Sequence, residues 1–413
     1  MKLPAALRRA PLAGHANLPS PTPLSTGMKL LGAALGVVLV SAIAIATFVI
    51  VDLGTRATDD AVALEGAPEI APPTIGEFPG PFDIVLAGTD ECGPISTKYL
   101  GERCEDEDGI LNDANLLVHV SDEPRRVTVI SFPRDLMLEV PACEREDGSE
   151  ASGMSKQPLN TLYAHAGLSC VAKTIGELSG IPVGFAAKLS FDGVIEMTDA
   201  IGGVDVCVAE PGLRDEHTGL DLPAGMHTVK GLEALQFLRT RHGVGDESDL
   251  ARISNQQQYM SRLAKKILSD DVLGDPAAVL RLANAVAENI VPSAELSDPI
   301  RLAQLALAIR DVPFSDFVFV QYPTVTDPYD PDRVVANEEA AAALWAALEQ
   351  NQPLELTGDA SPNGGVEEVT PQPEAPAEPT AEPTTPPEER TELPSEVTGV
   401  TVDQETCSAG RLN

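Results

Sequence analysis

The chain has 413 residues, of which 63 are acidic and 28 are basic, and its formal net charge at pH 7 is −35. Proteins that bind nucleic acid present clustered positive charge to phosphates, so this composition argues against nucleic acid as a partner. The length exceeds that of most single domains, but both ends differ in composition from the middle, so we expect one folded domain with appendages.

Residues 30–51 form an uncharged apolar run that is long enough to cross a hydrocarbon core of about 30 Å as one helix. A cleaved signal peptide is the alternative, but its apolar core is usually shorter. Basic residues dominate before the run and acidic residues after it, so the positive-inside rule places the N-terminus in the cytoplasm. We therefore predict a single-pass protein of the cytoplasmic membrane, extracellular after Asp52. Its first parts are a cytoplasmic segment (1–29), a transmembrane helix (30–51) and an extracellular linker (52–80).

All six cysteines lie in the part of the chain that is expected to be extracellular, where disulfides persist. No two of them form a CxxC pair, so disulfides are favoured over metal ligation. Cys92 and Cys104 would close a short loop, whereas the full connectivity does not follow from the sequence. The cysteines are Cys92, Cys104, Cys143, Cys170, Cys207 and Cys407.

Between residues 81 and 350, short apolar runs alternate with helical periodicity, which is typical of an α/β domain. The predicted strands are 82–88, 116–121, 127–132, 185–191, 204–208 and 317–322. The predicted helices are 159–179, 193–200, 231–238, 250–268, 276–289, 299–310 and 337–349. Helices on both faces of one sheet would give a three-layer α-β-α sandwich around a central mixed sheet.

The end of the chain has a different composition. Residues 362–396 are rich in Pro, Glu and Thr and contain few bulky apolar side chains. Such a segment buries too little surface to offset its ordering entropy, so residues 351–413 are expected to form an acidic, disordered tail. Cys407 suggests that the far end of this tail is tied down.

Polar residues lie at the ends of several predicted strands, where an α/β sheet usually presents its site. Asp90 follows the first strand and Asp113 precedes the second, and two such carboxylates suit a hard divalent cation such as Mg²⁺ or Mn²⁺. Ordinary turn chemistry is the alternative. Arg134 follows the third strand and could either grip two phosphate oxygens or pair with Asp135.

Arginines, which are scarce in this acidic chain, gather between residues 237 and 258. Arg239 and Arg241 are two residues apart at a predicted helix end, and an extended exit from that helix would put both side chains on one side. Arg252 lies nearby in the same stretch. Converging guanidinium groups suit a diphosphate, whereas a solvated pair at a helix C-terminus is the alternative.

Asp249 and Gln256 are seven residues apart, on one face of a predicted helix, and both could turn toward Arg239 and Arg241. Their plainer roles are those of a helix N-cap and a solvated side chain. His242 could act as an acid or a base, although a lone exposed histidine is more often incidental.

Four blocks, taken in order, resemble the LytR-CpsA-Psr family of bacterial cell-wall glycopolymer ligases. They are FDIVLAGTD, NDANLLVHVSDEPRRVTVISFPRD, LNTLYAHAG with FDGVIEMTDAIGGVDV, and LEALQFLRTRHGVGDESDLARISNQQQ. The resemblance covers roughly residues 82–268 and continues less specifically toward residue 350. The chain departs from the family pattern at Cys92 and Asn255, where the family often has basic residues.

The resemblance implies a catalytic domain over residues 81–350 that faces the cell wall. It also implies a donor made of a glycopolymer on a polyprenyl diphosphate, with the polyprenyl tail in an apolar cleft. The family transfers the phosphoglycosyl group to a peptidoglycan hydroxyl, forms a phosphodiester and releases polyprenyl phosphate.

The roles of individual residues follow from the same resemblance. Asp90 and Asp113 would hold Mg²⁺, and Asp135 is the candidate that would activate the acceptor hydroxyl. The side chains that would grip the diphosphate, or orient the groups that do, are Arg134, Arg239, Arg241, Asp249, Arg252 and Gln256.

Two other functions use the same features. A non-catalytic extracellular protein that binds polyprenyl phosphates or wall polymer would need the apolar cleft and the arginines without the metal. A polyprenyl-diphosphate hydrolase would use the metal and the arginines with water as the acceptor.

Overall fold

The structure is a computed structural model that describes residue 58 and residues 61–104, 109–369 and 390–411. The chain divides into two units, Met1–Asp52 and Leu53–Asn413, and every described residue lies in the second. The candidate membrane span at 30–51 and the segment before it lie outside the described residues. Within the described part, no helix is both long enough and apolar enough to cross a membrane.

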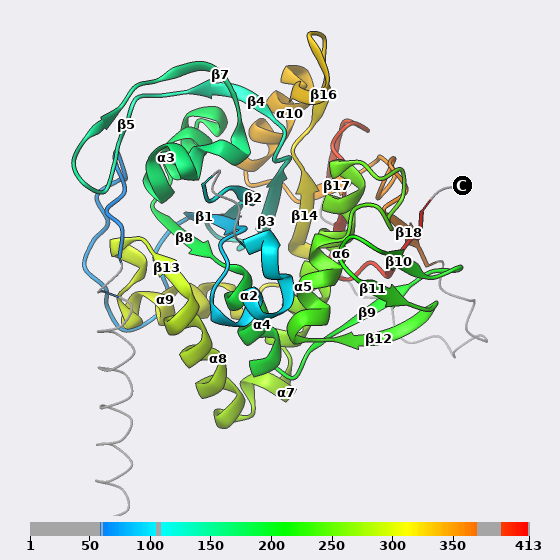
Figure 1. Ribbon diagram of the computed structural model, residues 1–413. Helices are drawn as coiled ribbons and strands as arrows, with labels where there is room; N and C mark the ends of the chain where they lie inside the picture. The colour runs from blue at the N-terminus through cyan, green and yellow to red at the C-terminus, as the bar shows by residue number, and fades with distance from the viewer. Residues whose placement is uncertain (1–57, 59–60, 105–108, 370–389, 412–413) are drawn as a thin grey trace, which may run out of the picture. The chain divides into compact units, whose positions relative to one another are not determined.

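A mixed seven-stranded sheet forms the centre of the second unit, with the strand order β13-β8-β1-β2-β3-β14-β20 (Figure 1). β1 pairs in parallel with β8, and β3 with β14, whereas the other neighbours are antiparallel. The strands are β1 (Phe82–Thr89), β2 (Asn112–Val120), β3 (Val127–Phe132), β8 (Phe185–Leu189), β13 (Ile290–Pro292), β14 (Phe317–Gln321) and β20 (Gly399–Thr401). Five of the six predicted strands lie in this sheet.

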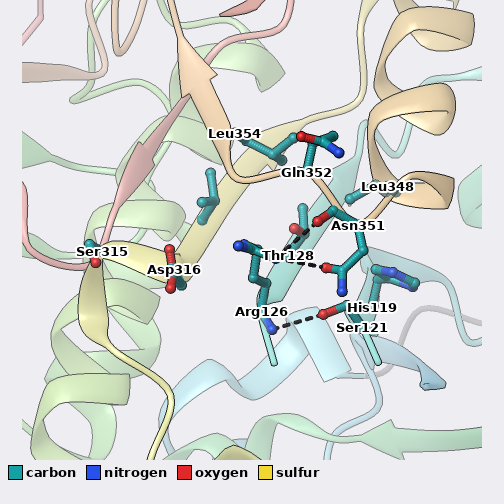
Figure 2. Close-up of a pocket in the computed structure, with 11 residues that line it drawn as sticks. His119, Ser121, Arg126, Thr128, Ser315, Asp316, Leu348, Asn351, Gln352 and Leu354 are labelled. Carbon is teal, nitrogen blue, oxygen red and sulfur yellow. Dashed lines mark hydrogen bonds between the residues drawn. The ribbon is translucent and has the colours of Figure 1, made fainter. Parts of the chain in front are cut away.

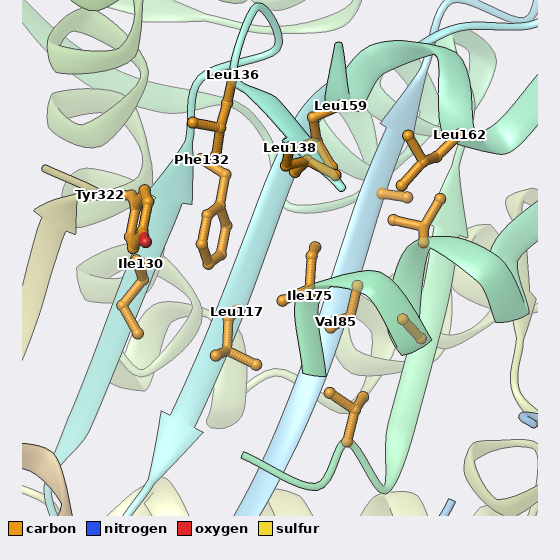
Figure 3. Close-up of a cluster of buried hydrophobic side chains, with 14 of the residues drawn as sticks. Val85, Leu117, Ile130, Phe132, Leu136, Leu138, Leu159, Leu162, Ile175 and Tyr322 are labelled. Atoms are coloured by element: carbon orange, nitrogen blue, oxygen red, sulfur yellow. The ribbon is translucent and has the colours of Figure 1, made fainter. Parts of the chain in front are cut away.

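Helices cover both faces of the sheet, so the three-layer prediction agrees with the structure. On one face, α3 and α10 bury apolar side chains against Val85, Leu117 and Ile130, as Figure 3 shows for α3. On the other face, α6 and α9 pack against Val129 and Phe319. The layer helices are α3 (Leu162–Ser179), α6 (Asp249–Ile267), α9 (Pro299–Arg310) and α10 (Glu338–Glu349). Because helices cover both faces of the sheet, the central strands are nearly continuous apolar runs in the sequence.

The remaining elements surround this sandwich. The helices are α2 (Pro94–Leu100), α4 (Phe191–Ala200), α5 (Gly231–Arg239), α7 (Asp270–Leu273) and α8 (Pro276–Asn289), and the 3₁₀ helices are η1 (Gly101–Cys104), η2 (Leu159–Thr161), η3 (Ala294–Leu296) and η4 (Phe314–Asp316). The short strand pairs are β4 (Met137–Val140) with β7 (Met154–Pro158), β5 (Cys143–Glu144) with β6 (Glu150–Ala151), β10 (Leu213–Asp215) with β11 (Leu220–Leu222), and β15 (Thr324–Asp327) with β16 (Asp330–Ala336). All seven predicted helices are present within a few residues.

A second sheet has the strand order β12-β9-β21-β18, and it takes the predicted strand at residues 204–208 out of the central sheet. Its strands are β9 (Val204–Val208), β12 (Gly225–Val229), β18 (Val366–Glu368) and β21 (Thr406–Ser408). Two of the four strands come from the region after residue 350, so the sequence beyond that boundary belongs to the fold.

The prediction of a disordered tail over residues 351–413 is therefore wrong for residues 351–369 and 390–411. β17 (Leu354–Leu356) pairs with β19 (Thr391–Leu393), and β20 adds an edge strand to the central sheet. Val397, Val400 and Val402 are buried there. The abundance of Pro and Glu in the intervening stretch masked these short apolar clusters. Residues 370–389, the centre of the predicted tail, lie outside the described residues.

The six cysteines form three disulfides, which confirms the preference for disulfides over metal ligation. Cys92 bonds to Cys104, as the short-loop reading suggested, and Cys143 bonds to Cys170. Cys207 on β9 bonds to Cys407 on β21, so the C-terminal strand is covalently fixed to the second sheet.

Candidate functional site

An apolar cavity of about 510 Å³ lies between the central sheet and helices α4, α5 and α6. Its floor is formed by sheet residues such as Leu86, Leu116 and Ala187, and its walls by helix residues such as Leu235 and Met260. Ligand cavities of this size that are lined mostly by apolar side chains take hydrophobic or amphipathic molecules. The cavity therefore suits a lipid chain better than a polar metabolite.

Polar side chains converge at one end of this cavity and continue into an adjoining hollow of about 340 Å³. Asp113, Phe191 and Arg239 line both spaces, and Asp90 lines the hollow. The side chains of Arg134, Arg241, Arg252 and Gln256 line the cavity. The structure thus brings together seven of the sequence-predicted residues around one apolar space with a polar mouth. These are Asp90, Asp113, Arg134, Arg239, Arg241, Arg252 and Gln256.

Strand pairing places the two predicted metal ligands near each other. Thr89, the last residue of β1, pairs with Asn112, the first residue of β2, so Asp90 and Asp113 lie at the same edge of the sheet. The Asp90 Oδ1 atom accepts a hydrogen bond from the Leu111 backbone N–H at 2.7 Å. Burial raises the pKa of the Asp90 carboxyl, and the negative charge of Asp113 raises it further. The hydrogen bond from Leu111 lowers the pKa, but by less than burial raises it.

These two carboxylates fit a magnesium ion in their chemistry. Mg²⁺ keeps several waters and substrate oxygens, so it needs only one or two protein carboxylates. The pKa of Asp90 is raised mainly by burial and to a smaller extent by the negative charge of Asp113, and a divalent cation would neutralise the charge of both carboxylates. Among the described residues, no group of three or more His, Cys, Asp or Glu side chains forms a closed metal cage.

Arg134 is held by carboxylates on two sides. Its Nη1 donates to Asp113 Oδ1 at 3.0 Å, and its Nε lies 3.5 Å from Asp249 Oδ1. Burial alone would lower the pKa of Arg134, but the charges of Asp113 and Asp249 outweigh it and raise the pKa. The guanidinium therefore stays charged inside the site.

Asp249 is buried between two arginines. Its Oδ1 lies 2.6 Å from Arg252 Nη2, and Arg252 Nη2 also donates to the Asp113 backbone oxygen at 3.1 Å. The N-cap of α6 is Ser248, whose side chain accepts from the Ala251 backbone N–H, so Asp249 does not cap the helix. Asp249 instead contacts both Arg134 and Arg252.

Arg239 and Arg241 leave α5 in the extended manner that the glycine-containing loop predicted, with Thr240 at φ −61° and ψ 132°. The Arg239 guanidinium carbon lies 4.6 Å from the centre of the Phe191 ring, a cation–π contact on the wall that both spaces share. The Arg241 Nε donates to the Glu247 backbone oxygen at 2.8 Å. Gln256 Nε2 donates to the Leu238 backbone oxygen at 2.9 Å, so it contacts the end of α5.

Asp215 organises the turn after α5, and sequence reasoning did not single it out. It is buried, and its Oδ2 accepts from the Thr240 hydroxyl at 2.7 Å and from the backbone N–H groups of Arg241 and His242 at 3.0 and 3.1 Å. Burial opposes its ionisation, but the hydrogen bonds from Thr240 and Arg241 outweigh it, and the pKa of Asp215 is lowered. Asp215 lies in a short strand 24 residues before Arg239, and no local motif connects the two.

Asp135 is brought next to one predicted residue, because its Oδ2 lies 3.7 Å from Arg134 Nε. Its carboxylate also pairs with Arg333 on β16, and it lines neither the cavity nor the hollow. The structure therefore lends no geometric support to Asp135 as the group that activates an acceptor.

A separate small hollow lies at the opposite end of β2 and β3 (Figure 2). There the Arg126 guanidinium donates to the Asn351 backbone oxygen at 2.9 Å and to Asn351 Oδ1 at 3.1 Å. Its volume of about 10 Å³ is barely enough for one water molecule. The contact between Arg126 and Asn351 connects the end of α10 to the sheet. The hollow is too small to be a substrate site.

Comparisons with known proteins agree with this geometry. The LytR_cpsA_psr family model matches residues 54–349. Cell wall biosynthesis protein LcpA of Corynebacterium glutamicum is 29% identical over 233 residues, which are 51% of this chain and 45% of that protein. The polyisoprenyl-teichoic acid–peptidoglycan teichoic acid transferase TagT of Bacillus subtilis is 25% identical over 236 residues, which are 56% of this chain and 66% of that protein.

The chain spans about half the length of the first curated relatives that it matches. Among solved structures, protein gbs0355 from Streptococcus agalactiae is similar with a TM-score of 0.52 and 20% identity, over 66% of this chain and 87% of that chain. This likeness shows a shared fold. Because the family model covers well over half of the chain, the protein belongs to the LytR-CpsA-Psr family.

Proposed function

We propose that the protein transfers a phosphoglycosyl polymer from a polyprenyl-diphosphate carrier to a hydroxyl group of peptidoglycan, forming a phosphodiester during cell-wall assembly. The observation that carries this proposal is the apolar cavity that opens directly onto a mouth of arginines and carboxylates. Only an amphipathic substrate uses both parts. The names of the relatives, a cell wall biosynthesis protein and a teichoic acid transferase, point to the same class of reaction.

The polyprenyl tail occupies the cavity between the sheet and α4, α5 and α6. Burial of apolar surface there supplies binding energy of about 25 cal/mol per Å². The diphosphate then lies at the mouth, against Arg134, Arg239 and Arg241. Arginine suits this position because its planar guanidinium forms paired hydrogen bonds to phosphate oxygens and remains charged when partly buried.

The same arginines stabilise the charge that develops during transfer. The oxygen that bridges the two phosphates gains negative charge as its bond to the glycosyl-bearing phosphorus breaks, and preorganised cations at that position lower the barrier. Asp249 and Arg252 hold Arg134 in place, and the Gln256 side chain fixes the end of α5. Arg252 and Gln256 also line the cavity that would hold the substrate.

Asp90 and Asp113 would hold Mg²⁺ or Mn²⁺. When bound, the ion would neutralise part of the diphosphate charge. Asp113 also accepts from Arg134, so the same carboxylate would link the metal to the phosphate grip.

We place the protein in the cytoplasmic membrane as a single-pass protein, with the N-terminus inside and the catalytic domain facing the cell wall. The apolar run at residues 30–51 and its flanking charges support this placement. The three disulfides support an oxidising location for the folded unit.

The test uses the full chain in detergent with a synthetic polyprenyl-diphosphate oligosaccharide, peptidoglycan fragments and Mg²⁺, and mass spectrometry of the products. We expect a phosphodiester-linked conjugate that disappears with EDTA. Arg239→Ala should lower kcat/KM by about 10²-fold or more, because it removes a cation from the mouth. Arg310→Ala is the matched control, since Arg310 is exposed on α9 and pairs with Asp311 far from the cavity.

The two other functions give different products. Free phosphoglycan without conjugate would support the hydrolase. An unchanged donor that binds to the protein would support the non-catalytic binding protein, and Asp113→Asn would then leave donor binding intact. Transfer that is equal in Arg239→Ala and the wild type would contradict the assigned role of the mouth.

A further inference from the structure

His242 lies on the rim of both the cavity and the hollow, directly after Arg241. Its Nδ1 is 3.1 Å from Glu247 Oε2, and its side chain is 45% exposed. With the carboxylate as acceptor, Nδ1 carries the proton and the unprotonated Nε2 lies on the opposite side of the ring. The described part of the chain supplies no hydrogen bond to Nε2. A carboxylate that orients an imidazole in this way is the arrangement that makes histidine an effective base.

The backbone around His242 is fixed on two sides. The His242 N–H donates to buried Asp215, and Glu247 adopts a positive φ of 66°, which is unusual for a residue other than glycine. The backbone oxygen of Glu247 accepts from Arg241 Nε, and its Oε1 lies 2.5 Å from Arg411 Nε. One residue therefore positions both the phosphate-gripping Arg241 and the imidazole of His242. A strained residue that holds two groups at a site is a feature of functional loops.

The other carboxylates near the mouth are less suited to remove a proton. Asp113 and Asp249 are engaged by arginines, and Asp135 pairs with Arg333 outside both spaces. Asp90 accepts from a backbone N–H and is the expected metal ligand. At the mouth, His242 combines an exposed side chain with a carboxylate that orients the ring.

We propose that His242, oriented by Glu247, is the general base that activates the acceptor hydroxyl; this inference rests on the proposed function. The hydroxyl proton passes to His242 Nε2 as the hydroxyl oxygen bonds to the glycosyl-bearing phosphorus. The bond from that phosphorus to the bridging oxygen breaks, and polyprenyl phosphate leaves with the electron pair. The proton on Nε2 then returns to water. No oxidant or further reactant is needed.

The role predicts a definite pH dependence. A protonated imidazole cannot accept the hydroxyl proton, so kcat/KM must fall at acid pH. The groups that face His242 are His217, whose ring centre is 4.3 Å away, Glu247, and across the hollow Asp90, Asp113 and Arg239. Arg241 precedes it in the chain, Asp215 lies beneath its backbone, and Arg411 pairs with Glu247.

The experiment measures initial rates of conjugate formation between pH 5 and 9 for the full chain with the synthetic donor and a soluble peptidoglycan oligosaccharide. His242→Asn should lower kcat by about 10²- to 10⁴-fold, the usual contribution of a general base, and should abolish the decline toward low pH. The KM for the donor should stay near the wild-type value, because the cavity and the arginines are intact. A merely structural role would change KM and thermal stability without removing the acid limb.

Two further variants sharpen the result. Glu247→Gln keeps the loop but removes the carboxylate that orients the imidazole, so we expect a loss of kcat that is smaller than that of His242→Asn. His227→Asn is the matched control, since His227 lies on β12, its ring contacts the Pro223 backbone oxygen, and it lines neither the cavity nor the hollow. It should behave as the wild type.

Wild-type kcat and an unchanged acid limb in His242→Asn would overturn the assignment of the base while leaving the transferase intact. Free phosphoglycan without conjugate from the wild-type protein would overturn the proposed function itself, and the base with it. The two failures are therefore distinguishable in one set of assays.

Discussion

Asp215 shows how one buried carboxylate can organise several residues of the site. It accepts hydrogen bonds from the side chain of Thr240 and from the backbone of His217, Arg241 and His242. Each of these donors lies at the mouth or next to it. The lowered pKa of Asp215 means that the network is tighter with the carboxylate ionised, so its contribution to folding depends on pH.

Asp215→Asn should therefore destabilise the protein by about 2 kcal/mol at pH 7, because an amide cannot accept from as many donors as a carboxylate. The folded pKa lies below the ordinary value of 3.8, so the stabilisation is fully present above about pH 4 and is lost as the pH falls through the folded pKa. The difference in unfolding free energy between wild type and variant, measured by urea-induced unfolding, should be constant near neutral pH and should become smaller below about pH 4.

The exposed Asp221→Asn on β11 serves as the control and should change the unfolding free energy by less than about 0.5 kcal/mol. A wild-type to Asp215→Asn difference that stays constant down to pH 2 would show that the charge of Asp215 is not what holds the turn.

The site residues that could be predicted from the sequence stand in recognisable sequence patterns, whereas the site residues that were missed do not. Asp90, Asp113 and Arg134 stand at the ends of apolar strands, and Arg239 and Arg241 are close together in the chain, so periodicity and composition made them visible. Asp215 acts through contacts formed only when separate segments meet, and Glu247 acts through the conformation of its loop. Acidic residues are too common in this chain for their type to distinguish these two. Asp135 is a different case, because it contacts both Arg134 and Arg333 without lining the cavity or the hollow.

At the scale of elements, the long strands and helices were predictable because their apolar patterns extend over many residues. The strands after residue 350 are only three residues long, too short for an alternating pattern, and their order depends on pairing with β14 and β9. The disulfide between Cys207 and Cys407 fixes one of these pairings. Its sequence separation is 200 residues, against 12 for Cys92 and Cys104.

Loop-closure entropy predicts different effects for removing these two disulfides. Replacing both Cys207 and Cys407 with Ala should destabilise the protein by up to about 5 kcal/mol, and replacing Cys92 and Cys104 by up to about 3 kcal/mol. Equilibrium unfolding in urea without reductant, together with circular dichroism of the native state, measures both. An equal or reversed order would mean that local packing, and not restriction of the unfolded chain, sets the contribution of each bond.

For the molecule as a whole, the folded unit extends well past the boundary at residue 350 that composition suggested. β20 covers the edge of β14 in the central sheet, and β21 lies between β9 and β18 in the second sheet. Arg411 also reaches Glu247 in the loop that carries His242. The C-terminal strands therefore stabilise the two sheets and the loop next to the site. A protein that ends at residue 350 would lack strands of both sheets.

A cut within residues 370–389 tests this organisation without removing any strand. This stretch contains several Glu residues in a Pro- and Thr-rich context, so a Glu-specific protease should cleave it under mild conditions. The C-terminal piece should remain attached through β20 and the disulfide of Cys207 with Cys407, with thermal stability close to that of the intact chain. On a denaturing gel, the short C-terminal fragment should separate from the rest of the chain only after the disulfide is reduced. Mass spectrometry should identify the cleaved peptide bond. Release of the fragment without reductant would contradict the disulfide between Cys207 and Cys407. Loss of folding immediately after cleavage would show that the intact chain connection is required. The pairing of β20 and β21 would then be too weak to keep the cleaved protein folded.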